Sequence, residues 1–139
     1  AKLKASESRG SDNNGKSGGD KSVYPFWNLK EGQFNGETWS SQVDRIIADL
    51  PSNVYISFDI DGLSPELCPN TGTPVAGGFK LEEINYLLFK LVESGKKVVG
   101  FDLNEVAPGK DDDWDANVGA RALWNLICAV EKNRRLHKA

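Results

Sequence analysis

Apolar residues recur at helical spacing in three stretches of the 139-residue chain, which are 39–50, 81–94 and 115–133. Intervals of three and four residues between apolar positions are typical of a helix that buries one face. Thr38 and Asp115 stand at the starts of the first and third stretches and are expected to be N-caps. Pro51 and Gly95 follow the first and second stretches and are expected to end them.

Two short apolar runs, 54–58 and 98–103, alternate with these helices. We expect them to be buried strands that are apolar on both faces. The order helix, strand, helix, strand, helix predicts an α/β layer with parallel strands and right-handed crossovers. A mean sheet has about 5–6 strands, and two strands alone leave both edges unpaired. We therefore expect the chain to be the later half of a larger α/β domain.

Three further segments have no helical period. Residues 1–22 are rich in Lys, Ser, Gly, Asn and Asp, and we expect a disordered or linker-like segment there. Residues 23–34 carry aromatic side chains and are expected to hold a short strand before a turn at Glu31 and Gly32. Residues 60–78 contain four glycines and three prolines. This composition predicts a long loop, and long ordered loops are usually functional.

Composition excludes several classes of function. The net charge of −3 gives no reason to expect a nucleic-acid or anionic membrane partner, and we expect a cytoplasmic protein. Cys68 and Cys128 are expected to be reduced and buried. The single histidine, His137, lies in a basic tail and is expected to be solvated. A Ser-His-Asp or Cys-His mechanism needs a placed imidazole, so carboxylate chemistry with a hard metal ion remains.

Asp59, Asp61 and Glu105 follow the two predicted strands. Strand residues i and i+2 point to the same side, which would place the two aspartate Cα atoms about 6.5–7 Å apart. Ligands of open parallel sheets bind beyond the carboxyl ends of the strands, so the three acids are expected to meet. Their repulsion should then be offset by a cation or by protonation of one of them. The alternative is that they are solvated strand exits or helix caps. The acidic run 111–115 is interpreted as a solvated turn that favours the start of the last helix.

Four segments resemble the ureohydrolases, the family of arginases, agmatinases and formimidoylglutamases. They are Ser-Phe-Asp-Ile-Asp-Gly-Leu-Ser-Pro (57–65), Pro-Asn-Thr-Gly-Thr-Pro-Val-Ala-Gly-Gly (69–78), Gly-Phe-Asp-Leu-Asn-Glu-Val-Ala-Pro (100–108) and Trp-Asp-Ala-Asn-Val-Gly-Ala-Arg (114–121). The likeness covers about 39–130 in one order. It implies a three-layer α/β/α parallel sheet of the arginase type, with residues 23–139 as its incomplete C-terminal half.

The resemblance also implies a function. It implies two Mn²⁺ ions bridged by hydroxide and hydrolysis of a small guanidino or amidino substrate, usually with release of urea. Asp59 matches a ligand of both ions, Asp61 matches a ligand of one, and Glu105 matches the acid that receives the cationic guanidinium. Trimers or hexamers are implied for full-length relatives.

The chain departs from the family pattern at several points. The Gly-Gly-Asp-His and Asp-Ala-His-x-Asp types of motif and the proton-shuttling histidine have no counterpart. Residues 18–21 resemble the first motif only superficially, because Lys21 replaces its histidine. Ser64 stands where aspartate is frequent, and Ala76 where proline is common. From the missing ligands we expect this chain alone to bind manganese weakly and to be inactive.

Two alternatives stay open. The first is a non-catalytic, truncated ureohydrolase-like module, which the reading frame upstream of Ala1 would distinguish from an enzyme fragment. The second is a haloacid-dehalogenase-type Mg²⁺ phosphohydrolase, because residues 59–62 also resemble the first motif of those enzymes, with Asp59 as nucleophile. The glycine-rich loop 71–78 and residues 104–106 have no place in that second scheme.

Overall fold

The computed structural model describes residues 23–138. In chain order, the elements are α1 (Phe26–Phe34), α2 (Trp39–Asp49), β1 (Asn53–Asp59), the short 3-10 helix η1 (Ile60–Gly62), α3 (Leu81–Glu93), β2 (Lys97–Asn104) and α4 (Trp114–Leu136). The segment 1–22, expected to be disordered, lies outside the described residues, and so does the motif-like stretch 18–21. Between residues 23 and 138, no helix is long and apolar enough to cross a membrane.

The predicted helices and their ends are largely confirmed. Helix α2 buries Val43, Ile46 and Ile47 on one face. Its N-cap is Thr38, whose Oγ1 accepts a hydrogen bond of 3.1 Å from the amide of Ser41. Helix α3 buries five apolar side chains at helical spacing, namely Ile84, Leu87, Leu88, Leu91 and Val92. The local apolar period was therefore enough to place these helices.

The strand predicted in residues 23–34 is wrong, because this segment forms helix α1. Pro25 is its N-cap residue and has an extended backbone, with φ −60° and ψ 139°, so the helix begins directly after the proline. Leu29 is buried, and the Phe26 ring packs edge-on against Phe79 with 5.0 Å between centroids. Positions 26 and 29 share one helical face, and this contact with a residue far along the chain selects the helix.

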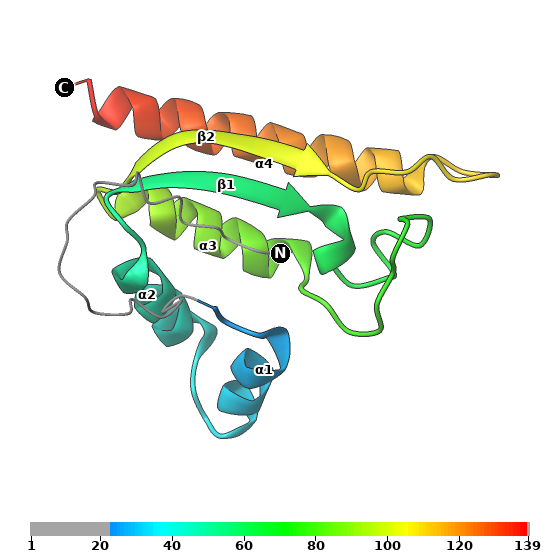
Figure 1. Cartoon of the computed structure of the whole chain (residues 1–139), viewed down its shortest axis with the longest axis horizontal. Helices are drawn as coiled ribbons and strands as arrows, with labels where there is room; N and C mark the ends of the chain where they lie inside the picture. Colours follow the sequence, from blue (N-terminus) through cyan, green and yellow to red (C-terminus); the bar gives the residue numbers. More distant parts are fainter. Residues whose placement is uncertain (1–22, 139) are drawn as a thin grey trace, which may run out of the picture.

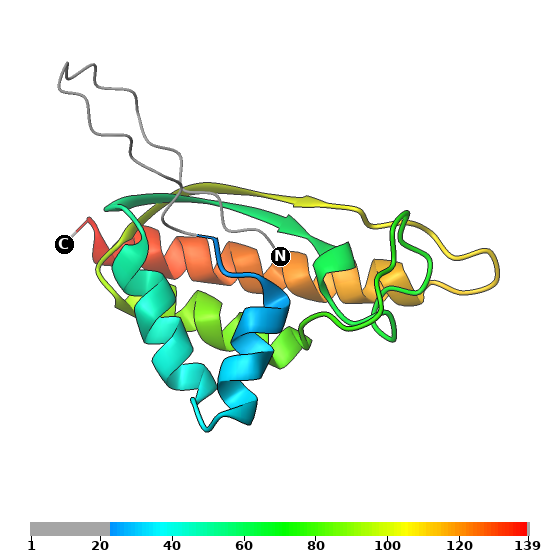
Figure 2. The same ribbon diagram turned by 60° about the horizontal axis from the view of Figure 1, so that its bottom comes forward.

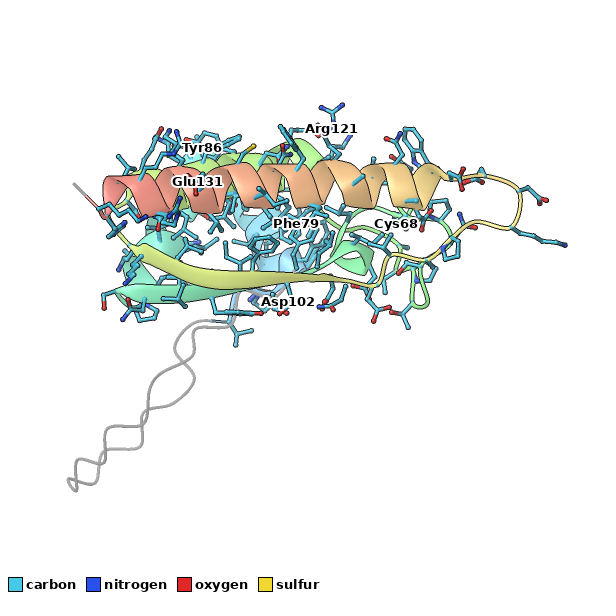
Figure 3. All side chains as sticks on the ribbon, turned by 90° about the horizontal axis from the view of Figure 1, so that it is seen from above. Cys68, Phe79, Tyr86, Asp102, Arg121 and Glu131 are labelled. Carbon is cyan, nitrogen blue, oxygen red and sulfur yellow. The ribbon has the colours of Figure 1, made fainter. Side chains whose placement is uncertain are left out.

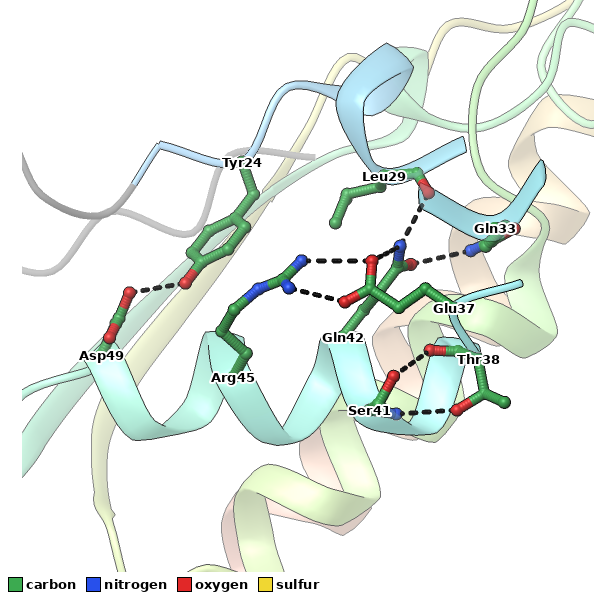
Figure 4. A network of polar contacts seen from close by, with 9 residues as sticks. All are labelled: Tyr24, Leu29, Gln33, Glu37, Thr38, Ser41, Gln42, Arg45 and Asp49. Atoms are coloured by element: carbon green, nitrogen blue, oxygen red, sulfur yellow. Dashed lines mark hydrogen bonds and ion pairs between the residues drawn. The ribbon is translucent and has the colours of Figure 1, made fainter. Parts of the chain in front are cut away.

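A buried polar network joins α1 to α2 (Figure 4). Gln42 is completely buried, and its Nε2 donates to the carbonyl of Leu29 at 2.7 Å and to Oε2 of Glu37 at 2.8 Å. Its Oε1 accepts a hydrogen bond from Gln33 at 2.9 Å. Arg45 pairs with the same Glu37 carboxylate from the exposed side. Both polar atoms of the buried Gln42 side chain thus have hydrogen-bond partners where α1 and α2 meet.

Strands β1 and β2 pair in parallel, and the helices lie on one face of the sheet (Figures 1 and 2). Helix α3 connects the two strands, and α4 returns along β2. The prediction of an α/β fold with parallel strands is confirmed. Among the described residues the sheet has two strands. This sheet and the helices on its one covered face make up two of the three layers that the resemblance implies (Figure 2).

The register of the sheet contains a β-bulge. Val54 pairs with Val98, but the next residue, Tyr55, pairs with Gly100. Val99 is therefore one extra residue on β2, and every later pair is shifted by one. The shift places Asp102 opposite Ser57.

The two faces of the sheet differ, so the prediction of strands apolar on both faces is wrong. Ile56 and Phe58 are buried, and Phe101 and Leu103 pack against the same core. The opposite face carries polar side chains, which are Tyr55, Ser57, Asp59, Asp102 and Asn104. Figure 3 shows Asp102 on the side of the sheet away from α4.

The predicted burial is confirmed for one cysteine and wrong for the other, and the predicted exposure of the histidine is confirmed. Cys68 is buried and its thiol donates to the carbonyl of Ile60 at 3.1 Å, but Cys128 is exposed on α4, where burial was expected. His137 is exposed, and its ring lies 2.9 Å from the carbonyl of Asn133 and 3.2 Å from that of Gly95. Because Gly95 precedes β2, His137 lies at the opposite end of the strands from Asp59.

Candidate carboxylate site

The candidate site lies where the two strands end. Asp59 is the last residue of β1 and pairs with Asn104, the last residue of β2. Asp61 lies two residues beyond Asp59, and Glu105 directly follows Asn104. Parallel pairing therefore brings the three sequence-predicted acids to one edge of the sheet, as the order of the segments indicated.

The strand geometry expected for the aspartates applies only to Asp59. The chain leaves the strand there, and Asp61 is the middle residue of η1. Successive side chains of a 3-10 helix point about 120° apart, so alternation across a strand does not set the direction of Asp61. Burial of Ile60, which is completely inaccessible, fixes this turn against the core instead.

A Thr-Gly-Thr segment, residues 71–73, contacts two of the three acids. The hydroxyl of Thr73 donates to Oδ2 of Asp61 at 2.8 Å. The hydroxyl of Thr71, whose residue is 4% exposed, donates to the backbone carbonyl of Glu105 at 2.9 Å. Gly72 lies between them, and a Cβ there would stand 3.5 Å from Oε2 of Glu105. The segment thus lies directly beside both carboxylates.

Glu105 adopts a strained backbone conformation. Its φ is +64°, and it is the one non-glycine residue in the described part of the chain with a positive φ. That region costs about 1–2 kcal/mol for an L-residue. The hydrogen bond from the buried Thr71 to the Glu105 carbonyl is available to offset part of this cost. Strain held in this way is typical of functional positions.

Asp59 belongs to a second network on the polar face of the sheet. Nδ2 of Asn104 donates to Oδ1 of Asp59 at 3.2 Å and also contacts Oδ1 of Asp102. Ser57 donates to the same oxygen of Asp102 at 2.9 Å. The hydrogen bond from Ser57, with those from Tyr55 and Asn104, lowers the pKa of Asp102 below its ordinary value. Asp102 is therefore a charged acceptor that orients Asn104 toward Asp59.

Asp115 is not the N-cap that the sequence predicts. Helix α4 begins at Trp114 with Asp113 as its N-cap residue, and Asp115 is completely buried in the first turn. Its Oδ2 accepts a hydrogen bond from the amide of Asn70 and its Oδ1 accepts one from the Asn70 side chain, both at 3.0 Å. The carboxylate therefore attaches the loop 63–79 to α4. The neighbouring Asp111, Asp112 and Asp113 are exposed, as expected for a solvated turn.

The donors at this edge are of the right chemical type for a hard cation but are few. Carboxylate oxygens suit Mn²⁺ and Mg²⁺, and Asp59 and Asp61 each use one oxygen in the hydrogen bonds above. Within residues 23–138, no group of three or more His, Cys, Asp or Glu side chains is arranged to hold a metal ion. The described residues therefore supply part of a two-metal ligand set, and no reaction step can be derived through the ions.

These elements define a parallel α/β protein with acidic residues at the carboxyl ends of its strands. Residues 24–129 match the model of the arginase family. The match covers most of the chain, so this protein belongs to the arginase family.

Curated relatives have similar sequences over part of their length. The N(1)-aminopropylagmatine ureohydrolase of Thermococcus kodakarensis is 40% identical over 87 residues, which are 63% of this chain and 30% of the relative. The agmatinase of Klebsiella pneumoniae is 42% identical over 91 residues, which are 62% of this chain and 28% of the relative. The matched part of the chain thus spans about three tenths of the length of these relatives.

Solved structures give the same result. A hypothetical agmatinase from Burkholderia thailandensis has a TM-score of 0.63 at 30% identity, covering 76% of this chain and 33% of that protein. The agmatine ureohydrolase of Thermoplasma volcanium has a TM-score of 0.62 at 27% identity, covering 80% of this chain and 35% of that protein. The parallel fold described above therefore corresponds to about a third of an arginase-type structure. The family match over residues 24–129 favours the arginase family over the phosphohydrolase alternative.

Proposed function

We propose that this chain carries part of the active site of a binuclear manganese hydrolase that cleaves linear amidines or guanidines with release of urea. We further propose that residues 23–139 are the carboxyl-terminal part of the ureohydrolase domain. The observation that carries the proposal is the placement of Asp59, Asp61 and Glu105 at or just beyond the ends of two adjacent parallel strands, in a chain of the arginase family. The names of the relatives, agmatinase and aminopropylagmatine ureohydrolase, support this substrate class.

Each proposed role is the one that the resemblance to the family implies, and the chemistry of the residue supports it. Asp59 would bind both ions and Asp61 one of them, and carboxylates are suitable donors for such hard ions. When bound, a pair of ions would supply a water of lowered pKa as the nucleophile. Glu105 would accept the planar cationic group of the substrate in a charge-assisted and potentially bidentate contact. A Cβ at position 72 would stand 3.5 Å from Oε2 of Glu105, so glycine there avoids a contact on one side of this carboxylate.

The proposal predicts weak metal binding by this chain alone. Two octahedral ions need more donors than Asp59 and Asp61 provide, even when water fills several positions. Titration of the 139-residue chain with Mn²⁺ tests this, with paramagnetic line broadening of amide signals as the readout. We expect broadening centred on residues 59–61 at millimolar Mn²⁺. The variant Asp61→Asn should reduce it, whereas the exposed Asp111→Asn should not. Broadening spread evenly over all acidic residues would contradict the proposed site.

Activity is tested separately from metal binding. Urea release from agmatine and arginine should be undetectable with this chain alone in saturating Mn²⁺. Micromolar Mn²⁺ affinity together with turnover would refute the expectation of an incomplete ligand set. The alternative of a non-catalytic binding or assembly module predicts no selective broadening at residues 59–61. The oligomeric state of a full-length relative, expected to be a trimer or hexamer, stays a prediction.

A further inference from the structure

We propose that Asp115 and Asn70 form a latch that positions the Thr-Gly-Thr segment, and through it the carboxylates of Asp61 and Glu105. Asp115 and Asn70 are positioning residues in this proposal, since neither contacts the two acids directly. The contacts of the latch do not depend on the proposed function. Its use for the protein does, because Asp61 and Glu105 are the proposed metal ligand and substrate-binding residue.

The latch is a two-point attachment of a half-buried asparagine to a buried carboxylate. Both oxygens of the Asp115 carboxylate accept from one residue, the amide and the side chain of Asn70, each at 3.0 Å. Asp115 has no exposed surface. Two parallel hydrogen bonds to a charged acceptor fix the orientation of a group as well as its distance. Asn70 is therefore held in one orientation against the first turn of α4.

Close packing also restricts the Asn70 side chain at Nδ2, the atom that donates to Asp115. A Cβ added at Gly109 would stand 3.0 Å from Nδ2 of Asn70 and 2.3 Å from the carbonyl oxygen of Asp112. The loop between β2 and α4 thus approaches the Asn70 side chain at its glycine. Gly109 therefore lets the loop between β2 and α4 pack against the residue that Asp115 holds.

Three consecutive residues carry the effect from the latch to the site. Thr71, next to Asn70, is buried and donates to the carbonyl of Glu105. Gly72 passes beside the Glu105 carboxylate, and Thr73 donates to Asp61. A rotation at Asn70 would displace the Thr71 hydroxyl, which supports the positive φ of Glu105. The latch thus controls a strained position without touching it.

A purely structural role is the competing interpretation. A carboxylate in the first turn of a helix stabilises that helix through its dipole. Asn70→Ala separates the two roles, because it removes the side-chain donor and leaves the Asp115 charge in α4. Asp115→Asn removes both the charge and one strong acceptor. Asp111→Asn and Asp113→Asn make the same change of charge at exposed positions and serve as matched controls.

The experiment measures amide hydrogen exchange and the Glu105 Cα and Cβ chemical shifts by NMR in the metal-free, 139-residue chain. In Asn70→Ala, we expect amides 70–73 to exchange at least about tenfold faster, the scale of one lost hydrogen bond to a charged group. The Glu105 shifts should move away from values typical of a positive φ, while amides 117–119 of α4 keep their protection. Amides of α2 and β1 report that each variant is folded.

Unchanged Glu105 shifts in Asn70→Ala would overturn the proposal. It would also be overturned if Asp111→Asn and Asp113→Asn changed the Glu105 shifts and the exchange of amides 70–73 as much as Asp115→Asn does. If Asp115→Asn does not fold, Asn70→Ala alone decides. Because no metal or substrate is present, failure of the proposed function leaves this result untouched. A functional latch with no Mn²⁺ broadening at residues 59–61 would refute the metal site and leave the latch standing.

Discussion

Thr73 donates a hydrogen bond of 2.8 Å to Oδ2 of Asp61, twelve residues earlier in the chain. The contact links the glycine-rich loop to the turn that follows β1. The hydrogen bond orients the Asp61 carboxylate and engages Oδ2 but not Oδ1. Groups that orient a metal ligand in this way typically contribute ten- to a hundred-fold to metal affinity.

We therefore expect Thr73→Val to weaken Mn²⁺ binding at residues 59–61 by roughly tenfold. Thr73 is exposed, so the free energy of unfolding should change by less than about 0.5 kcal/mol. Thr73→Ser keeps the hydroxyl and is the matched control. Equal Mn²⁺ broadening in the valine and serine variants would show that this hydrogen bond does not orient Asp61.

Gly78 and Gly36 allow backbone strain to be separated from steric clash. Both have positive φ, +96° and +94°, but a Cβ at Gly78 would stand 2.4 Å from the carbonyl oxygen of Leu63, whereas nothing lies within 4 Å of one at Gly36. Gly36→Ala should cost about 1–2 kcal/mol from φ alone. Gly78→Ala should cost about 1–3 kcal/mol more, because backbone must move. Urea denaturation measures both, and equal costs would contradict the clash.

Gln42 is the centre of the network between α1 and α2. Gln42→Leu removes its three hydrogen bonds and leaves the Leu29 carbonyl without its 2.7 Å donor, so we expect a loss of about 1–3 kcal/mol in the free energy of unfolding. Ser40→Ala breaks one exposed contact to Tyr86 and should change stability by less than about 0.5 kcal/mol. Comparable losses in the two variants would show that the buried network adds nothing specific.

The two cysteines should differ in reactivity. Burial raises the pKa of the Cys68 thiol, and the negative charges of Asp115 and Asp61 raise it further. Because the thiolate is the nucleophile, iodoacetamide at pH 8 should modify the exposed Cys128 at least about tenfold faster than Cys68. Mass spectrometry of digested protein measures both rates. In denaturant the difference should disappear, and equal rates in the folded chain would contradict the burial of Cys68.

Glu131 should give α4 a small acid-dependent stability. Hydrogen bonds from Arg134, then Arg135, lower the pKa of Glu131 from 4.5 to about 2. A pKa lower in the folded state stabilises the protein above the ordinary value of 4.5, and this contribution is lost as the pH falls toward about 2. The Tm difference between wild type and Glu131→Gln should therefore shrink over that range. It should also shrink in 1 M salt, because the group is exposed. A difference that persists at pH 2 would contradict the ion pairs.

The sequence was informative where structure depends on local periodicity. Apolar residues at intervals of three and four placed α2 and α3, and two short apolar runs placed the strands. Helix α1 could not be predicted in this way, because only Leu29 is fully buried on it and Phe26 finds its partner, Phe79, 53 residues later. Its helical state depends on contacts that no short window contains.

The site was predictable in part for the same reason. Asp59, Asp61 and Glu105 follow apolar runs, so parallel pairing alone brings them to one edge. The roles of Asn70, Thr71 and Asp115 depend on hydrogen bonds between distant segments, and a buried aspartate near a helix start looks the same in sequence as an N-cap. The signal that could have found Thr71 and Thr73 is their placement around a glycine in a loop too long to be a simple connection.

The extra residue at Val99 has a consequence for the chemistry of the strand that follows it. Side chains alternate along a regular strand, so an extra residue that no bulge absorbed would turn every later side chain to the opposite face. Strict alternation from the buried Val98 would point Asp102 and Asn104 into the core and Phe101 and Leu103 outward. The bulge at Val99 therefore keeps Phe101 and Leu103 on the core side and leaves Asp102 and Asn104 on the polar face that carries Asp59.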